Sequence, residues 1–203
     1  IPIAHDHGGP PRVGGPFTFP PMSTSELPPQ YDHAATERDL YAQWQDAGVF
    51  TARAERSRRA AGDRAPYTIV IPPPNVTAVL HMGHGLNNTV QDVVIRWRRM
   101  SGDEALWVPG TDHAGIATQN VVEKALAKEG KTRFDLGRDA FVARTAQHVN
   151  ETGGTILSQL RAIGASADWT RTAYTLSPQL SRAVREAFVR LFERGLIYRG
   201  HRV

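Results

Sequence analysis

Hydrophobic residues recur along the chain with the two periods that distinguish helices from strands. Over residues 34–50, Leu40, Trp44 and Ala47 fall on one face of a helix, which we expect to end near Gly48. The regular structure of the chain is therefore expected to begin with an amphipathic helix.

A strand, a helix and a second strand are expected next, in close succession. Residues 67–71 form a short β-branched run that three prolines end, which is typical of a buried strand in a parallel sheet. Residues 83–100 carry apolar side chains at helical spacing, and residues 105–108 form a second short apolar run. This order predicts a βαβ unit with a right-handed crossover, and hence an α/β fold. The apolar helix positions are Leu86, Val90, Val93, Val94 and Trp97.

Helical patterns dominate the second half of the chain. Residues 116–128 predict one helix, and residues 136–163 predict others. The last helix has the clearest boundaries, with Ser177 as its N-cap, Pro178 at its first position and Gly195 beyond its end. Its expected buried face consists of Leu180, Val184, Phe188 and Leu191.

Two segments have neither pattern. Residues 1–30 contain 8 prolines and 4 glycines, so we expect them to be disordered. The chain begins with Ile1, while Met22 opens a stretch that would suit a natural start, so residues 1–21 need not belong to the mature protein. The arginine-rich residues 53–64 predict an exposed linker.

The composition excludes several classes of protein. With 40% hydrophobic and 22% charged residues among 203, the chain is expected to fold. It has no cysteine, which excludes disulfides, thiolate nucleophiles and cysteine-based zinc sites. No apolar run approaches the roughly 18 residues of a membrane span, and no export signal is evident, so we expect a cytoplasmic protein without membrane contact. The net charge of +4 agrees with an anionic partner such as a nucleotide or RNA.

The loop after the first strand has the features of a nucleotide site. It runs into the N-terminus of a helix, where free backbone N–H groups and the helix dipole attract phosphate. Gly83 allows a base or phosphate to approach the backbone, and His81 and His84 lie on the same side of the first turn. Their ring nitrogens can donate to the oxygens of a triphosphate. Neither the P-loop nor the dinucleotide-binding glycine pattern is present in the chain.

Two other interpretations of the histidine pair stay open. Both histidines can simply cap the helix that they precede. With His113, His81 and His84 can also bind zinc, although the glycine between them gains nothing from a metal.

The loop after the second strand carries a single acidic residue. Ligands of an open α/β sheet bind outside the carboxyl ends of its strands, and residues 110–119 follow the second strand at that place. Asp112 would face the first loop and can hold an ammonium group through a charge-assisted hydrogen bond. The alternative is that Asp112 is the N-cap of the next helix.

Residues 71–119 contain Pro-Pro-Pro-Asn-Val-Thr, His-Met-Gly-His, Arg-Trp-Arg-Arg-Met and Thr-Asp-His-Ala-Gly-Ile-Ala-Thr-Gln. With these motifs the chain resembles the valyl-tRNA synthetases, a family of class I aminoacyl-tRNA synthetases. The last motif is the most specific, because the isoleucyl and leucyl families usually carry a Trp-Asp pair at its start. The His-x-Gly-His motif is weaker, because smaller nucleotidyltransferases that transfer an adenylyl group to a phosphorylated metabolite share it.

The resemblance implies a fold and a domain organisation for residues 31–203. They correspond to the first half of a Rossmann-like parallel-sheet catalytic domain with helical additions, which ends before the editing domain. The second signature loop and the anticodon-binding domain of the family would lie beyond Val203. On this basis we expect the isolated chain to be inactive, with strand edges and apolar helix faces left uncovered.

The resemblance also implies the reaction and the ATP-binding residues. The family activates valine with ATP, bound as its Mg²⁺ complex, and transfers the valyl group to tRNA(Val). His81, Gly83, His84 and Thr77 match the ATP-binding positions, and the two histidines match the signature that stabilises the transition state at the α-phosphate. No protein-bound metal is implied in this segment, and the complete enzyme is expected to be a monomer.

The implied amino-acid site comes from both loops. Asp112 matches the acid that holds the α-ammonium group, and Pro73 and Asn75 match the loop that walls the side-chain pocket. The family usually has Gly and Ala where this chain has Ala78 and Gly85. If position 78 requires a positive φ, Ala78 would strain the loop by roughly 1 kcal/mol.

Overall fold

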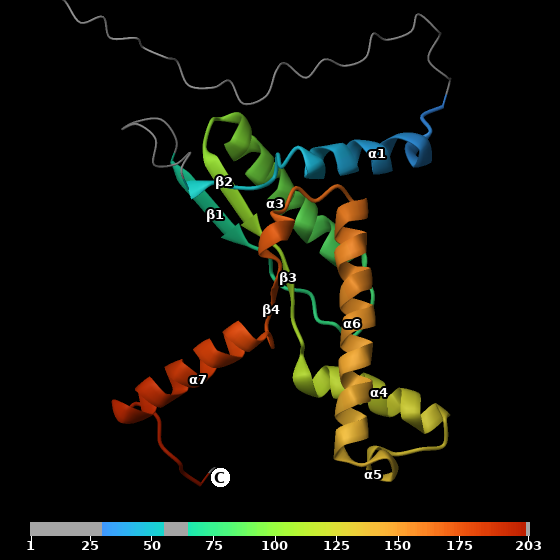
Figure 1. The fold of residues 1–203 in the computed structure, drawn as a ribbon, viewed down its shortest axis with the longest axis vertical. Coiled ribbons are helices and arrows are strands. Elements are labelled where there is room, and N and C mark those ends of the chain that lie inside the picture. The colour runs from blue at the N-terminus through green and yellow to red at the C-terminus, as the bar shows by residue number, and fades with distance from the viewer. Residues whose placement is uncertain (1–29, 55–64, 202–203) are drawn as a thin grey trace, which may run out of the picture.

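A computed structural model describes residues 30–54 and 65–201 (Figure 1). The expectations for residues 1–29 and 55–64 lie outside these described residues. The strands are β1 (Pro66–Val70), β2 (Glu104–Val108), β3 (Gly110–Thr111) and β4 (Ala173–Tyr174). The α-helices are α1 (His33–Asp46), α3 (Met82–Met100), α4 (Gly115–Lys128), α5 (Arg133–Leu136), α6 (Arg138–Ala162) and α7 (Pro178–Glu193), and Trp169–Arg171 form a 3-10 turn.

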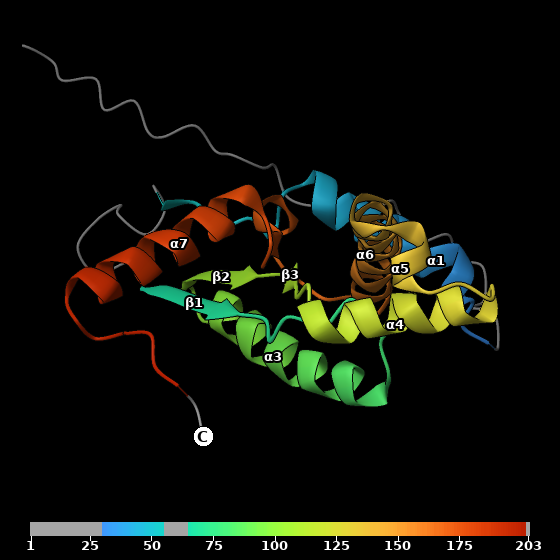
Figure 2. The same ribbon diagram turned by 90° about the horizontal axis from the view of Figure 1, so that it is seen from below.

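The predicted βαβ unit is confirmed, with α3 on one face of the two strands (Figure 2). Strands β1 and β2 pair in parallel, from Pro66 opposite Glu104 to Val70 opposite Val108. The expectation that the first strand is fully buried is wrong, because its side chains alternate and Val70 is 67% exposed. Among the described residues, only one face of β1 is therefore covered.

The main core lies between the two strands, α3 and α6. Trp107 of β2, Ile95 of α3 and Ile156 and Leu160 of α6 have no exposed surface. Removal of this apolar area from water is the main driving force for the packing of these elements. Where several helices were expected over residues 136–163, the structure has chiefly one long helix, α6. This helix runs from α1 at one end of the molecule to α4 and α5 at the other (Figure 1).

Strand β2 continues as an extended segment with a neighbour on each side. The backbone N–H group of Asp168 donates to the carbonyl group of Trp107 at 2.9 Å, and farther along β3 pairs in parallel with β4. Gly110 is required here, because a Cβ atom at this position would lie 2.6 Å from the carbonyl oxygen of Ala173. The close approach brings the end of β4 beside the second candidate loop.

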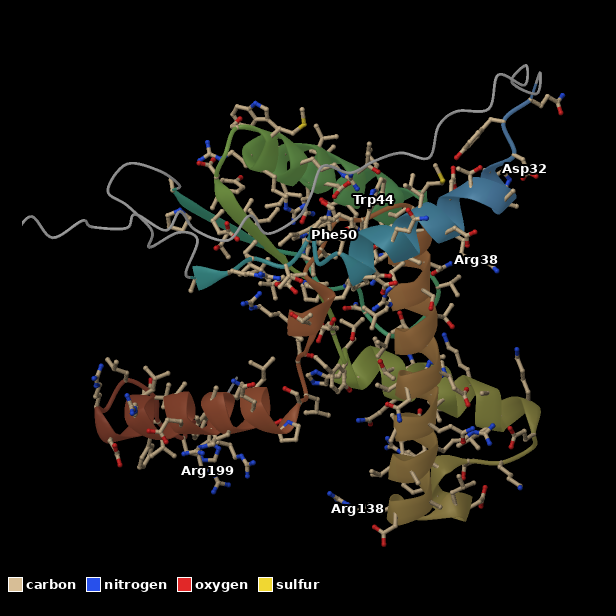
Figure 3. The ribbon with its side chains drawn as sticks, turned by 45° about the horizontal axis from the view of Figure 1, so that its top comes forward. Asp32, Arg38, Trp44, Phe50, Arg138 and Arg199 are labelled. Atoms are coloured by element: carbon tan, nitrogen blue, oxygen red, sulfur yellow. The ribbon has the colours of Figure 1, made fainter. Side chains whose placement is uncertain are left out.

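The apolar face of α7 is exposed, contrary to the prediction of a buried face. Helix α7 extends away from the other elements in two views (Figures 1 and 3), and none of its residues is buried. Val184 is 65% and Phe188 64% exposed, and on α3 Val93 and Trp97 are 62% and 59% exposed. The uncovered apolar helix faces that the resemblance implied are thus present. The predicted boundaries of α7, with Ser177 as N-cap and Pro178 in the first turn, are confirmed.

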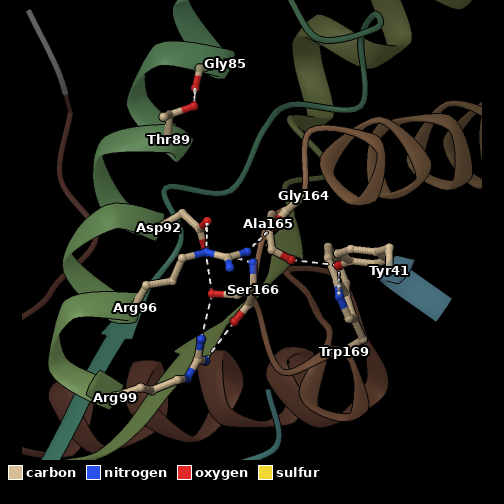
Figure 4. A network of polar contacts seen from close by, with 10 residues as sticks. All are labelled: Tyr41, Gly85, Thr89, Asp92, Arg96, Arg99, Gly164, Ala165, Ser166 and Trp169. Carbon is tan, nitrogen blue, oxygen red and sulfur yellow. Dashed lines mark hydrogen bonds and ion pairs between the residues drawn. The ribbon is translucent and has the colours of Figure 1, made fainter. Parts of the chain in front are cut away.

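The opposite face of α3 carries polar side chains beside the buried Ile95 and holds the turn that follows α6 (Figure 4). Asp92 accepts hydrogen bonds from the backbone N–H group of Ser166 at 2.8 Å and from its hydroxyl group at 2.5 Å. Arg99 donates to the hydroxyl and carbonyl oxygens of Ser166 at 2.6 and 2.7 Å, and Arg96 donates to the carbonyl group of Gly164 at 2.6 Å. These charge-assisted bonds fix the segment that leads into β4.

Helix α1 begins and ends close to the predicted positions but buries a different residue. Tyr41 is buried and Ala47 is exposed, so the predicted contact face is shifted by one residue. The guanidinium group of Arg96 lies over the rings of Trp44, near the end of α1, and Phe50, a few residues beyond it (Figure 3), at 5.7 and 5.9 Å from the ring centres. Within the described residues, no helix has both the length and the apolar character needed to cross a membrane.

The hydroxyl group of Tyr41 joins α1 to the turn after α6, and its removal should destabilise the fold. It donates to the carbonyl group of Ala165 and accepts from the indole N–H group of Trp169, both at 2.7 Å. Tyr41→Phe leaves both groups without this partner, so the free energy of unfolding should fall by about 1–3 kcal/mol. The measurement is urea unfolding followed by tryptophan fluorescence. Tyr31→Phe, at a side chain that is 65% exposed, is the control and should change stability by less than about 0.5 kcal/mol.

Candidate functional site

The first loop rests on α6. Val76 has no exposed surface and packs in the main core, where its Cγ1 atom would lie 3.7 Å from a Cβ atom at Gly153. Four residues later, the backbone N–H group of Leu80 donates to the side-chain Oε1 atom of Gln159 at 2.9 Å. The loop therefore reaches the start of α3 with both its middle and its end held by one helix.

The two signature histidines cap the N-terminus of α3 reciprocally. His81 is the N-cap, and its Nδ1 atom accepts from the backbone N–H group of Gly83 at 3.1 Å. The Nδ1 atom of His84 accepts in turn from the backbone N–H group of His81 at 3.3 Å. The two ring centroids lie 4.0 Å apart. The capping interpretation of the pair is thus confirmed for this structure, with imidazoles in the places of a capping-box Ser and Glu.

Capping does not exclude the pair from binding an anion, because it fixes the tautomer that such binding needs. A neutral imidazole has one N–H group, and in both rings the Nδ1 atom accepts a hydrogen bond. The proton of each neutral ring must therefore be on Nε2. Among the described residues no group accepts from either Nε2–H group, so both can donate at the positive end of α3, where the helix dipole also favours negative charge.

Gly83 is needed for a reason that the sequence does not reveal. A Cβ atom at position 83 would lie 2.9 Å from Cε1 and 3.1 Å from Nδ1 of His81. The imidazole of His81 itself occupies the space that the absent side chain leaves. At Gly85, by contrast, a Cβ atom would meet nothing within 4 Å, so the Ala that is usual in the family would fit.

The second loop lies beside the first, as expected for Asp112. The backbone N–H group of Asp112 donates to the carbonyl group of Pro74 at 2.8 Å, and that of Val76 donates to the carbonyl group of Asp112 at 2.9 Å. Asn75 and Asp112 therefore form a parallel bridge, and Pro73 and Asn75 are exposed on the first loop. The predicted amino-acid-binding residues are thus neighbours in space.

The predicted ATP-binding residues follow a few positions along the same loop. Thr77 is half-buried in the turn after the bridge, and His81, Gly83 and His84 are at the start of α3. Val76, whose N–H group donates to the carbonyl group of Asp112, is five residues before His81. At roughly 3.4 Å per residue, the backbones of Val76 and His81 are therefore at most about 17 Å apart.

Thr175, at the end of β4, is a site residue that the sequence analysis missed. Its hydroxyl group donates to Oδ1 of Asp112 at 2.8 Å and accepts from the backbone N–H group of His113 at 3.0 Å. It also lies 2.5 Å from Nδ1 of His113. Thr175 belongs to no recognised motif and is 63 residues from Asp112 in the chain, so no local signal could have identified it.

The structure does not support one alternative role of Asp112 or the condition under which Ala78 would be strained. The N-cap of α4 is Ala114 and not Asp112, whose Oδ1 atom accepts only a 3.3 Å bond from the N–H group of Ala114. Ala78 is not strained by a positive φ, because Ala114, with φ of 44°, is the only non-glycine residue in the described ranges with a positive φ. Any cost of left-handed backbone in this part of the chain is therefore at the start of α4.

The zinc interpretation has no support in the described ranges, where no three His, Asp or Glu side chains are placed to hold a metal ion.

A cavity of about 830 Å³ lies beyond His113, between α4, α6 and β4. His113, Gly115, Phe141 and Tyr174 are among its lining residues, but His81 and His84 are not. This cavity is therefore separate from the start of α3.

Comparison with known proteins gives a consistent result. The family model for tRNA synthetases class I (I, L, M and V) matches residues 39–203. The valine-tRNA ligase of Geobacter sulfurreducens is 54% identical over 182 residues, which are 90% of this chain and 20% of that protein. That of Syntrophotalea carbinolica is 55% identical over 178 residues, which are 88% and 19% of the two chains.

The relatives extend to a plant organelle and to a solved structure. The mitochondrial valine-tRNA ligase 1 of Arabidopsis thaliana is 51% identical over 181 residues, covering 89% of this chain and 16% of its own. The chain therefore spans about a fifth of the length of the curated relatives that it matches. A solved structure also matches, the crystal structure of the ternary complex of Agrobacterium radiobacter K84 agnB2 LeuRS-tRNA-LeuAMS. The match covers 84% of this chain and 19% of that chain, with a TM-score of 0.66 and 22% sequence identity. This likeness supports the fold.

The geometry of the histidine pair predicts a pH dependence. Partial burial lowers the pKa of His84, and the neighbouring His81 lowers it further. Between this lowered pKa and the unfolded value of about 6.5, the unfolded chain binds more protons than the folded one, so stability should fall as the pH drops below about 6.5. NMR titration of the His84 ring is the measurement. In His81→Asn the pKa of His84 should rise only in part, because burial is its larger cause, and a full return to the usual value would contradict this explanation.

Proposed function

The chain belongs to the tRNA synthetases of class I, and we propose that it supplies the ATP- and amino-acid-binding half of the catalytic domain of a valine-tRNA ligase. The identity of 54 and 55% to two valine-tRNA ligases supports the choice of valine within the family. The observation that carries the chemistry is the reciprocal cap of His81 and His84, which leaves two Nε2–H donors at the positive end of α3.

In the proposed reaction, a carboxylate oxygen of valine attacks the α-phosphorus of ATP, and pyrophosphate leaves. The bound substrate is ATP with Mg²⁺, which neutralises part of the phosphate charge. His81 and His84 donate hydrogen bonds to phosphate oxygens whose charge increases in the transition state. Because their caps fix both rings before ATP binds, little reorganisation is needed when this charge develops. Gly83 keeps the ring of His81 in place, and Thr77 faces ATP from the preceding turn.

The same proposal assigns the amino acid to the bridge between the two loops. Asp112 holds the α-ammonium group of valine, and Pro73 and Asn75 wall the side-chain pocket. The fixed φ of consecutive prolines means that little entropy is lost when the loop closes on a small branched side chain. A rigid pocket excludes isoleucine by its size, but it discriminates poorly against threonine, which has nearly the same shape as valine.

The remaining partners follow from the proposed activity. The complete protein would transfer the valyl group to tRNA(Val) and act in the cytoplasm as a monomer. The isolated chain would be inactive, because α7 and the outer face of α3 expose apolar side chains to water. Experiments on activity therefore use the full-length protein that contains this chain.

Valine-dependent exchange of pyrophosphate into ATP tests the proposal. The full-length enzyme should catalyse this exchange with valine at a kcat/KM at least tenfold above that with isoleucine, since one extra methylene in a closed pocket costs about 1–3 kcal/mol. Higher activity with isoleucine would overturn the choice of valine. Transfer of AMP to an acceptor that is not an amino acid would overturn the assignment to the synthetase reaction.

A matched pair of glycine substitutions tests the role of the cap. Gly83→Ala forces the ring of His81 to move, because the new Cβ atom would be 2.9 Å from its Cε1 atom. The kcat of exchange should fall by about 10²-fold, the typical effect of one misplaced donor. Gly85→Ala adds the same methyl group two residues later in open space, so activity should stay within about twofold and the helix should gain about 1 kcal/mol. Equal losses in the two variants would contradict the proposed role of the His81 ring.

A further inference from the structure

We propose that Thr175 is a positioning residue for amino-acid recognition, because its hydroxyl group holds Oδ1 of Asp112 and turns the other carboxylate oxygen toward the ammonium group. This inference rests on the proposed function and extends it to a residue on a separate segment of the chain. It is carried by the contacts among Thr175, His113 and Asp112.

The hydroxyl group of Thr175 uses its full hydrogen-bonding capacity in these contacts. A hydroxyl group has one proton to donate and two lone pairs to accept with. It accepts from the backbone N–H group of His113 at 3.0 Å and lies 2.5 Å from the Nδ1 atom of the same residue. Its own proton points to Oδ1 of Asp112 at 2.8 Å. A group with three partners has a single orientation.

The direction of the chain of bonds follows from the charges. The carboxylate of Asp112 is a stronger acceptor than the neutral ring of His113, so the hydroxyl proton of Thr175 goes to Asp112. The Nδ1 atom of His113 must then carry a proton and donate to the Thr175 oxygen. His113 is thereby held in the tautomer opposite to that of His81 and His84.

The bonds are concentrated on one oxygen of Asp112. Its Oδ1 atom accepts from Thr175, accepts from the N–H group of Ala114 at 3.3 Å and lies 3.4 Å from Nδ1 of His113. Within the described part of the chain, no group donates a hydrogen bond to Oδ2, and the side chain is 33% exposed. One oxygen thus fixes the rotamer, and the other remains available to an ammonium group.

A purely structural role for the hydroxyl group is not needed to hold β4. The backbone N–H groups of Ala173 and Thr175 already donate to the carbonyl groups of Pro109 and Thr111, at 2.9 and 3.3 Å. These bonds place Thr175 beside Asp112 whatever its side chain is. The side chain can therefore be changed while the strand pairing is retained, which makes the inference testable.

The experiment compares Thr175→Val with Thr175→Ser in the full-length enzyme. Thr175→Val keeps the shape of the side chain but removes the hydroxyl group. In pyrophosphate exchange, the KM for the substrate valine should therefore rise about tenfold or more, while the KM for ATP should stay within about twofold of the wild-type value. Thr175→Ser, which keeps the hydroxyl group, should restore most of the affinity. Thr172→Val makes the same replacement at an exposed threonine nearby, whose hydroxyl group donates to the carbonyl group of Trp169, and should leave both constants unchanged.

A second ligand separates positioning of the carboxylate from general damage to the pocket. Isovalerate has the side chain and carboxylate of valine but no ammonium group, so its inhibition constant in Thr175→Val should stay within about twofold of the wild-type value. A parallel rise for valine and isovalerate, an equal defect in Thr175→Ser, or wild-type behaviour of Thr175→Val would each overturn the inference while the proposed function stands. A wild-type enzyme without valine-dependent exchange would instead overturn the proposed function, and the inference with it.

Discussion

The site depends on the backbone pairing of one extended segment, residues 104–112, with a neighbour on each side. On one side, β1 and then Pro74 and Val76 form its hydrogen bonds; on the other side, Asp168 and then β4 do so. Three segments that are distant in the sequence are thereby brought together at the carboxyl end of β2. Since each bond is a backbone bond, a shift in register would disrupt the arrangement more than most side-chain changes, although no side chain fits at Gly110. A shift of one residue would turn Asp112 to the other face of the segment.

The histidines show how backbone groups determine the chemistry of side chains. In His81 and His84 the Nδ1 atom accepts from backbone N–H groups, so the exposed Nε2 atom is a donor. In His113 the Nδ1 atom lies against the Thr175 hydroxyl group, and in the tautomer that we infer, with Nδ1 donating to that oxygen, the Nε2 atom of the neutral ring is an acceptor. Neutral imidazoles of the same covalent structure can thus take two different hydrogen-bonding roles, one shared by His81 and His84 and the other taken by His113. The lowered pKa of His84 favours the same neutral form.

The sequence predicted the features that depend on local chemistry and missed those that depend on packing between distant segments. The strand-helix-strand order and the cap at Ser177 follow from short-range patterns, and the structure confirms them. The buried face of α3 could not be predicted in this way, because Asp92 and Arg99 face the interior to bind the turn at Ser166, while Trp97 is exposed. The contacts of Thr175 depend equally on a long-range pairing that no local pattern encodes.

The two loops present opposite charge, and a free amino acid carries a positive ammonium group and a negative carboxylate group on the same Cα atom. The start of α3 offers N–H donors and the positive end of a helix, while Asp112 offers a negatively charged acceptor. In the proposed function, an amino acid with its ammonium group at Asp112 would direct its carboxylate away from that acid, toward the histidines and the phosphate that they would hold. A reversed amino acid would bring its carboxylate against Asp112 and its ammonium group against N–H donors, which is unfavourable at both ends. In the proposed reaction, the distribution of charge would therefore orient the carboxylate nucleophile independently of the contacts that the pocket makes with the side chain, so orientation and specificity would be determined by different residues of the same loops.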